Sequence, residues 1–370
     1  MTTPAHDDAG AAAPASLPTV DRHLASHVFN VAVLVIGLGL LAWMVHDLGL
    51  DRARAVLRDA GGWFPLIVAL DVAAMACDAA AVHAFMRPEA RMVSFWRVLA
   101  AQASGRAVNI LTPGGALGEA TKVTMLVSHA PRARVVSAIV LADLASFYLS
   151  VTIVVLGVPL TLLIADLPHD LQVLIWIGLA VLVPLMAGLG VLVHRGAVGS
   201  LVGTLRGLRV ISAARARSWR DRLAEIDGHI RELQAARSEG TRIGLVFVGA
   251  SRLIAWGTLV IVLRAIDVHV TATLFVAVVS CGVLIGWIAA VVPLGLGVAD
   301  GSNYALFDAL GASGAHGLFM TLLNRARSLT IAVLGLVTMG VGHTLTRISL
   351  ARRRRRLLAM RRRRDGEDAP

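Results

Sequence analysis

The charged side chains that could do chemistry in this chain lie inside or beside long apolar runs. Glu119 and Lys122 are three residues apart, so they share one face of a helix, and Arg106 and Asn109 share a face by the same spacing. A carboxylate beside an ammonium group, with an arginine and an amide nearby, could bind a phosphate or exchange a proton. Each ionisable residue in a membrane span costs about 2.5–3.5 kcal/mol on insertion scales, so each requires a partner or a water-filled cavity.

Two short segments rich in proline and glycine carry the strongest pattern. The first, Leu111–Glu119, reads LTPGGALGE, and the second, Val292–Asp300, reads VPLGLGVAD. Proline and glycine interrupt helices, and backbone groups freed in a membrane must face protein, water or substrate. Each segment ends on a carboxylate. Paired broken helices of this kind predict a transport site near the middle of the membrane, with helix ends suited to a phosphate.

The candidate substrate-binding residues come from both broken segments, from a span between them and from the last span. We expect the basic groups to bind a phosphate. The carboxylates would balance those basic groups or exchange a proton during transport. For each charged residue a purely structural role in helix packing stays open, and Asp71, Asp78 and Asp143 are assigned mainly to that role. The candidates are Arg106, Asn109, Pro113, Gly114, Gly115, Gly118, Glu119, Lys122, Arg252, Pro293, Gly295, Gly297, Asp300, Asn303, Asn324 and Arg325.

The composition of the chain places these residues in a membrane. Of its 370 residues, 56% are hydrophobic and 16% are charged, whereas soluble domains carry about 25% charged residues. Several apolar runs approach the length of about 20 residues that a helix needs to cross a bilayer, and none alternates as a barrel strand would. We therefore expect an all-α polytopic protein with about six full transmembrane helices. The predicted spans are Val28–Val45, Trp63–Phe85, Val135–Ile164, Leu171–Val193, Ile243–Leu263 and Gly317–Gly342.

Loop charges predict the orientation, because positively charged loops stay in the cytoplasm. The arginine-rich connection 194–242 and the tail after Arg347 are therefore cytoplasmic, and the short acidic link Asp166–Asp170 faces outward. The scheme places the first loop outside, so the three arginines of that loop conflict with it. Once the sides of the neighbouring loops are assigned, residues 96–133 must enter and leave the membrane on its inner side. Residues 272–315 must do so on its outer side. The sequence thus predicts two broken re-entrant hairpins of opposite orientation, an inverted repeat.

The remaining segments divide the chain into three parts. Residues 1–27 are predicted to be a disordered cytoplasmic tail, residues 28–346 the membrane domain, and residues 347–370 a basic cytoplasmic tail. This tail fits contact with anionic lipid headgroups better than nucleic-acid binding. Within the loop 194–242, apolar residues recur at helical spacing from Leu223 to Leu233. They predict an amphipathic helix that packs on the membrane face of the protein.

The sequence offers little support for catalysis or for a cofactor. It contains no H-E-x-x-H, G-x-S-x-G or P-loop motif, and Gly295-Leu296-Gly297 follows a membrane span rather than a strand. The two cysteines have no metal-site spacing. We expect no cofactor, no metal and no catalytic residue, hence no enzyme. Two alternatives stay open: a membrane-embedded transferase that uses a carboxylate of the broken segments as base, and a non-transporting accessory protein of a membrane-lipid or envelope biosynthesis complex.

Both broken segments resemble a known family. The stretch Asn109–Lys122, NILTPGGALGEATK, resembles the asparagine–proline–glycine–glutamate–basic signature of the lysylphosphatidylglycerol synthase transmembrane (flippase-like) family. Residues Pro293–Gly301, followed by Asn324-Arg325, look like the second conserved region of that family. Asp300 stands where relatives often have glutamate, and the role of a carboxylate survives that change. The resemblance covers roughly Val28 to Gly342.

This resemblance implies a function for the chain. Such proteins move lipids or lipid-linked intermediates between the leaflets of a bacterial-type cytoplasmic membrane. The expected partners are membrane lipids with phosphate-bearing headgroups, and a second copy of the chain or lipid-synthesis enzymes are further candidates. Some relatives carry a C-terminal aminoacyltransferase domain. The segment after Arg347 is too short to fold into one, so lysyl transfer is not expected here.

Overall fold

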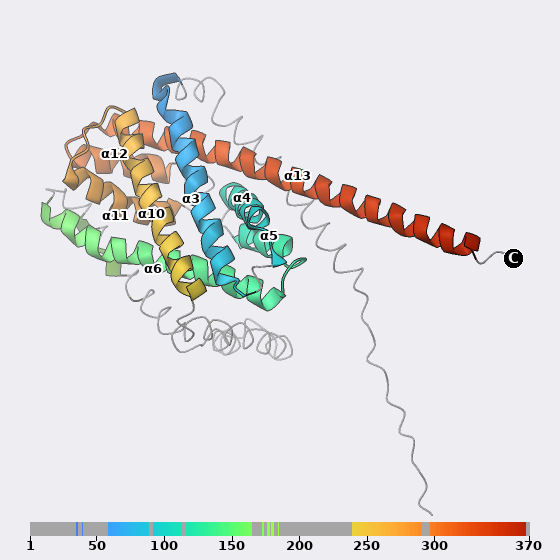
Figure 1. The fold of residues 1–370 in the computed structure, drawn as a ribbon. Coiled ribbons are helices and arrows are strands. Elements are labelled where there is room, and N and C mark those ends of the chain that lie inside the picture. The colour runs from blue at the N-terminus through green and yellow to red at the C-terminus, as the bar shows by residue number, and fades with distance from the viewer. Residues whose placement is uncertain are drawn as a thin grey trace, which may run out of the picture.

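The computed structural model describes residues 58–88, 92–112, 116–164, 239–289 and 297–367, with a few isolated positions at 35–39 and 172–184. This part of the chain is helical and contains no strand. The N-terminal tail and the predicted amphipathic helix lie outside it, and the predicted spans Val28–Val45 and Leu171–Val193 do so almost entirely. The helices (Figure 1) are α3 (Trp63–Phe85), α4 (Phe95–Leu111), α5 (Ala116–Leu126), α6 (Arg132–Ile164), α10 (Glu239–Ala265), α11 (Ala272–Ala289), α12 (Val298–Ala309) and α13 (Gly314–Glu367).

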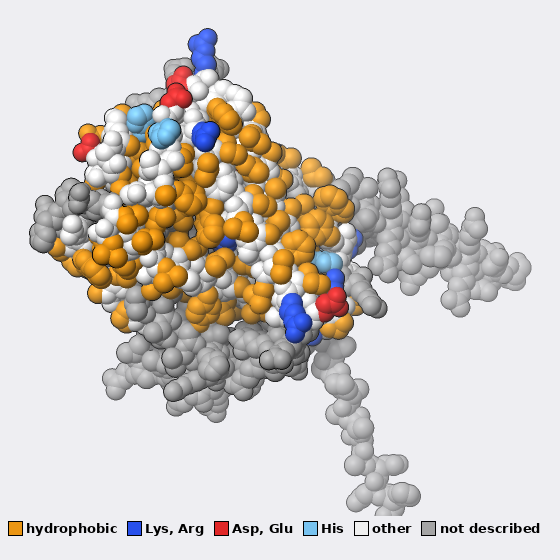
Figure 2. All heavy atoms as spheres, turned by 60° about the vertical axis from the view of Figure 1, so that its left-hand side comes forward, with side chains coloured by type: hydrophobic (Ala, Val, Ile, Leu, Met, Phe, Trp, Pro, Cys, Tyr) orange, Lys and Arg blue, Asp and Glu red, His pale blue; other side chains and the backbone are white. Residues whose placement is uncertain are grey.

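Four of the described helices are long and apolar enough to cross a membrane. They are α3, α6, α10 and the part of α13 from Gly314 to Gly342. Each lies within a few residues of a span predicted from the sequence. Figure 2 shows that apolar side chains cover much of one face and that charged groups lie mostly toward its margins. Large apolar side chains such as Leu66, Val246 and Leu253 are exposed, as expected where lipid replaces water. The chain is a multi-pass membrane protein.

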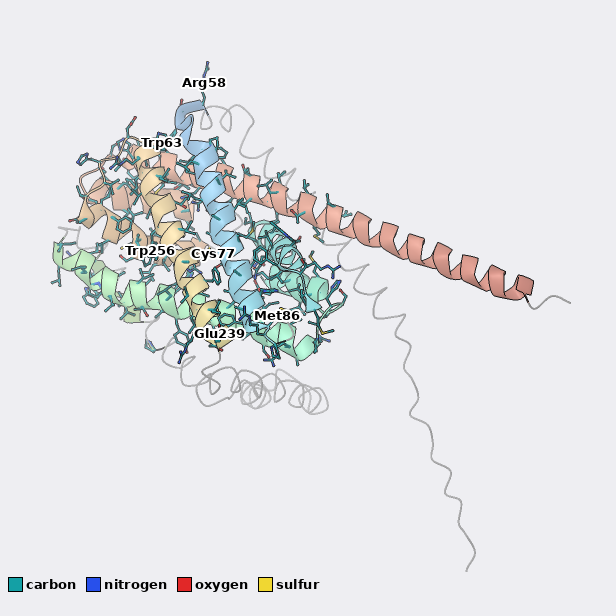
Figure 3. All side chains as sticks on the ribbon, in the orientation of Figure 1. Arg58, Trp63, Cys77, Met86, Glu239 and Trp256 are labelled. Atoms are coloured by element: carbon teal, nitrogen blue, oxygen red, sulfur yellow. The ribbon has the colours of Figure 1, made fainter. Side chains whose placement is uncertain are left out.

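Helices α3 and α10 form the most extensive pair. They run in opposite directions, because Met86, which follows α3, lies at the same end as Glu239, which begins α10 (Figure 3). Small residues bring their backbones together. A Cβ at Gly244 would collide with the Phe85 ring, and one at Gly240 would meet the carbonyl oxygen of Ala84. Close approach at small residues is a main source of helix packing in membranes.

Both predicted helix breaks are present in the backbone. Helix α4 ends at Leu111 and α5 begins at Ala116, while α11 ends at Ala289 and α12 begins at Val298. The two halves of each broken segment pack against each other, α4 on α5 and α11 on α12. Each therefore forms a helical hairpin. The second restarts at Gly297, whose φ of 77° lies in the left-handed region that favours glycine.

The buried side chains form two core clusters. The first cluster contains Phe85 at the end of α3, Val98 near the start of α4 and Leu126 at the end of α5. It also contains Val135 near the start of α6 and Val248 in the first half of α10. Both ends of the α4–α5 hairpin therefore pack together, beside the end of α3 and the start of α6.

The second cluster gathers the opposite ends of the same long helices. It contains Ile67 from the start of α3, Val158 from the end of α6 and Leu263 from the end of α10. Leu274 at the start of α11 and Phe307 at the end of α12 pack there too. Both ends of the α11–α12 hairpin are thus in one cluster, and that cluster lies at the other end of the bundle from the first.

The last helix, α13, is much longer than a membrane is thick. Its 54 residues correspond to about 80 Å at 1.5 Å per residue, against a hydrocarbon core of about 30 Å. Inside the bundle it packs mainly on α4 and α12, and beyond them it extends away from the other helices (Figure 1). The backbone of the predicted basic tail therefore continues the last span as a helix. Helix α6 is also long, with 33 residues, and it continues through Pro159.

Candidate binding cavity

A polar cavity of about 360 Å³ lies within the bundle. Its lining residues on α6 run from Ala142 to Ser150, where the α6 residues of the first core cluster end and those of the second begin. The cavity is therefore roughly midway along the bundle, and its volume falls in the usual range of about 300–1,000 Å³ for ligand sites. Three acidic and three basic side chains line it, from five helices: Asp78, Arg106, Glu119, Lys122, Asp143 and Arg252.

The contact between α4 and α5 shapes one wall of this cavity. A Cβ at Gly118 would collide with the carbonyl oxygen of Gly105 and with the side chain of Asn109. Because no side chain separates the two helices there, Asn109 on α4 can reach α5. Its Oδ1 accepts the Gly118 N–H at 2.8 Å, and its Nδ2 donates to Glu119 Oε1 at 3.0 Å. Asn109 thus fixes the position of the Glu119 carboxylate.

Glu119 has one satisfied oxygen and one that lacks a donor. Oε1 also accepts from Lys122 Nζ at 2.8 Å, and Lys122 is only 7% exposed. Oε2 is buried, and no described donor reaches it. Asp143 on α6 lines the same cavity as Glu119.

The two arginines of the cavity lack carboxylate partners. Among the described residues, no acidic side chain lies within ion-pair distance of Arg106 or Arg252. The buried Nε of Arg252 has no hydrogen-bond acceptor in that part of the chain. A guanidinium group that forms no ion pair can bind an anion with charge-assisted hydrogen bonds, so both arginines could bind an anion in the cavity.

The second broken segment forms its own polar contacts. Asp300 Oδ2 accepts from Arg325 Nη2 at 2.6 Å and from the Gly297 N–H at 2.9 Å. Asn303 Nδ2 donates to Thr321 Oγ1 at 2.9 Å. These contacts hold the start of α12 in place and join α12 to α13. None of these five residues is part of the cavity wall.

The sequence-predicted candidates thus fall into groups. Five line the cavity, and Gly118 packs behind them at the α4–α5 contact. Gly297, Asp300, Asn303 and Arg325 lie around the α12–α13 contact, and Asn324 is half-buried on α13. Pro113, Gly114, Gly115, Pro293 and Gly295 lie outside the described residues. The five residues that line the cavity are Arg106, Asn109, Glu119, Lys122 and Arg252.

Sequence reasoning left several lining residues off the list of candidates. Asp78, Gln102, Asp143 and Trp287 all line the cavity. The two aspartates stand inside otherwise apolar spans, where an ionisable residue is a functional hypothesis by default, and that signal could have placed them among the candidates. Asp71, in contrast, pairs with an arginine of α13 at 3.1 Å, outside the cavity wall, which fits a structural role.

No metal site accompanies these groups in the described part of the chain. No cluster of three or more His, Cys, Asp or Glu side chains there could hold an ion. The cavity can therefore offer a ligand charged and polar side chains from five helices. Its two arginines, which form no ion pair with a described carboxylate, suit an anion, and its carboxylates suit a hydrogen-bond donor or a proton.

Comparison with known families gives one result. The model described as the lysylphosphatidylglycerol synthase TM region matches residues 30–335. Neither the curated proteins nor the solved structures contain a match. The matched region includes both broken segments, every cavity-lining residue and the membrane-spanning part of α13 as far as residue 335. Because the match spans well over half of the chain, this protein belongs to the lysylphosphatidylglycerol synthase transmembrane-region family.

Proposed function

We propose that the protein translocates a lipid, or a lipid-linked intermediate, with an anionic phosphate-bearing headgroup across a bacterial-type cytoplasmic membrane. The observation that carries the proposal is the cavity midway along the bundle, where Arg106 and Arg252 have no carboxylate partner among the described residues. Guanidinium groups bind phosphate oxygens in pairs of charge-assisted hydrogen bonds. A volume of about 360 Å³ has room for a headgroup, while the acyl chains remain in the lipid.

We also propose that the α4–α5 and α11–α12 hairpins re-enter the membrane from opposite sides as an inverted repeat. The two core clusters support this arrangement. A hairpin whose two ends pack in one cluster returns to the side from which it started, and the two hairpins do so at opposite ends of α3 and α6. From the loop charges we propose that the α4–α5 side and both chain termini are cytoplasmic.

This geometry suits alternating access to a fixed site. In transporters built from inverted repeats, one repeat moves against the other around a site near the bilayer midplane. Here the cavity takes its charged groups from the first hairpin and from α3, α6 and α10, and Trp287 at the end of α11 reaches its wall from the second hairpin. Movement of α11 against the first hairpin would change the access to the headgroup.

Leaflet exchange in reconstituted vesicles tests the proposal. Vesicles that contain the protein and a fluorescent phosphatidylglycerol should exchange the label between leaflets faster than protein-free vesicles. Arg252→Gln should slow this exchange about tenfold or more, because it removes charge-assisted hydrogen bonds of about 1.5–3 kcal/mol. The matched control is Arg264→Gln, which changes an exposed arginine at the end of the same helix, outside the cavity wall.

The outcome separates the three functions. Equal exchange by the wild type and Arg252→Gln would refute the site. No exchange, with chemical turnover of an added lipid, would favour the membrane-embedded transferase. Neither exchange nor turnover would favour the accessory protein of a biosynthesis complex.

A further inference from the structure

One buried amide on the cavity wall forms a hydrogen bond with none of the described residues. Gln102 on α4 is only 8% exposed, and it lines the cavity. An amide side chain carries a carbonyl oxygen that accepts hydrogen bonds and an NH2 group that donates two. Buried polar groups in proteins are normally hydrogen-bonded. Gln102 is therefore suited to a ligand that can both donate to it and accept from it.

Gln102 lies beside the groups that suit a phosphate. On α4 it is followed by Arg106 and Asn109 at helical spacing, and all three line the cavity, so they form one stripe along its wall. Helix α6 contributes Asp143 and Ser146, which share a face in the same way. The Ser146 hydroxyl, like the Gln102 amide, forms no hydrogen bond with a described residue. The wall thus offers neutral hydrogen-bonding groups next to an arginine.

The chemistry of these groups limits the part of a headgroup that can face them. An ionised phosphate oxygen only accepts hydrogen bonds, so it would leave the carbonyl oxygen of Gln102 without a donor. An ammonium group only donates, so it would leave the NH2 group without an acceptor. A hydroxyl group does both, and it can also donate to a carboxylate such as that of Asp78 or Asp143, which line the same cavity. Hydroxyl groups therefore match this wall better than either charged group.

One end of the cavity is aromatic. Phe147 on α6 and Trp287 on α11 both line it, with ring centroids 5.6 Å apart, and both pack against the second core cluster. Ligand sites commonly combine such apolar surface with a few polar groups that orient the ligand. The carbon skeleton that carries hydroxyl groups can pack against the rings, whereas an isolated inorganic anion would gain nothing there.

We propose that Gln102 and Ser146 bind hydroxyl groups of the headgroup, so that the substrate is a phosphodiester lipid with a polyol beyond its phosphate. The inference rests on the proposed function and narrows its substrate class. The arginines bind the phosphate, Gln102 and Ser146 bind the hydroxyl groups, and the aromatic pair contacts the carbon atoms between them.

Two lipids that differ only in their hydroxyl groups test this inference. Dioctanoyl phosphatidylglycerol and dioctanoyl phosphatidylpropanol have the same charge and equally long headgroups, but the second has no hydroxyl group. Calorimetry measures their binding to the wild-type protein in phosphatidylcholine nanodiscs, and empty nanodiscs correct for partition into lipid. Phosphatidylglycerol should bind about tenfold more tightly, because it alone forms hydrogen bonds with Gln102 and Ser146. Dioctanoyl phosphatidylethanolamine, which carries an ammonium group, should bind more weakly than phosphatidylglycerol.

Substitution of the amide should remove the preference and keep the binding. Gln102→Leu has a side chain of similar size without hydrogen-bonding groups, so the ratio of the two affinities should fall several-fold while phosphatidylpropanol binds as before. If Gln102 only supported the fold, both affinities would fall alike. Ser146→Ala is a smaller change and should also lower the ratio. The matched control is Ser104→Ala, which changes a buried polar residue of α4 outside the cavity wall and should leave the ratio unchanged.

The results separate this inference from the proposed function. Equal binding of phosphatidylglycerol and phosphatidylpropanol by the wild type, or tighter binding of phosphatidylethanolamine, would overturn the recognition of hydroxyl groups and leave an anion site standing. Binding of none of these lipids would remove the proposed function and this inference with it. A wild-type ratio in Gln102→Leu would overturn the role of Gln102, and if that variant does not fold, an unchanged ratio in Ser146→Ala would overturn the assignment instead.

Discussion

A single methyl group at Gly118 should separate the two helices that position Glu119. In the Gly118→Ala variant the new Cβ would collide with the carbonyl oxygen of Gly105 and with the amide side chain of Asn109. The backbone oxygen cannot rotate away, so α4 and α5 must move apart. That movement also breaks the hydrogen bond from the Gly118 N–H to Asn109 Oδ1, which is 2.8 Å long.

The expected cost follows from these two effects. Overpacking a close contact costs about 1–3 kcal/mol, and loss of a typical hydrogen bond costs about 0.5–1.5 kcal/mol. Together they give a loss of about 2–4 kcal/mol in the free energy of unfolding, seen as a fall of several degrees in Tm. Because Asn109 also donates to Glu119 Oε1, the same change should displace the carboxylate and reduce lipid exchange.

The assay is thermal unfolding of the purified variants in detergent, with leaflet exchange as the second readout. Gly249→Ala is the matched control, because a Cβ there would have open space around it within helix α10. It should be neutral, or more stable by up to about 1 kcal/mol from the higher helix propensity of alanine. A Gly118→Ala protein as stable and as active as the Gly249→Ala protein would refute this account of the α4–α5 contact.

Three further predictions concern the charged groups, the tail and the orientation. Glu119→Gln should insert with near-normal thermal stability but lose lipid transfer, since it keeps a polar group and loses its charge, and full transfer by this variant would show that the site assignment is wrong. Arg325→Gln should instead lower the Tm, because it leaves Asp300 without its ion-pair partner, and an unchanged Tm would count against a structural role of this pair. Deletion from Arg352 onward, beyond the helix bundle, should leave an inserted and active protein, and loss of transfer by correctly inserted protein would count against this. In a background without native cysteines, Pro168→Cys should react with an impermeant label from outside and Arg215→Cys only from inside; reaction of the latter in intact cells would overturn the orientation.

The sequence predicted well the helices that are surrounded by lipid along their length. An apolar run in lipid has few alternatives to a helix, because every backbone group must be satisfied within the segment. The predicted span Trp63–Phe85 therefore has the same bounds as α3, and α6 and α10 extend their predicted spans by a few residues. The helix breaks were also predictable, since proline and glycine act locally. Continuation of α13 to Glu367 was not anticipated, although arginine, leucine and alanine are good helix formers.

The site was less accessible to sequence reasoning, because it depends on which helices are neighbours. Spacing along one helix correctly grouped Glu119 with Lys122, which form an ion pair. No local pattern could indicate that Asp143, in another span, lines the same cavity as Glu119. The similarity of the two broken segments predicted that both would line one binding cavity. In the described part of the chain, however, Asp300 and Arg325 pair with each other away from the cavity.

The central claim is that a phosphate-bearing lipid places its headgroup in the cavity, and photo-crosslinking measures this most directly. A diazirine amino acid would replace Met75, which is buried and lines the cavity. In a second protein it would replace Leu253, which is exposed on the outside of α10. After illumination in native membranes, mass spectrometry identifies the attached lipids. Position 75 should yield one class of phosphate-bearing lipid, and Arg252→Gln should abolish that product, while position 253 yields the bulk lipid mixture. No lipid at position 75, or the same mixture at both positions, would contradict the claim.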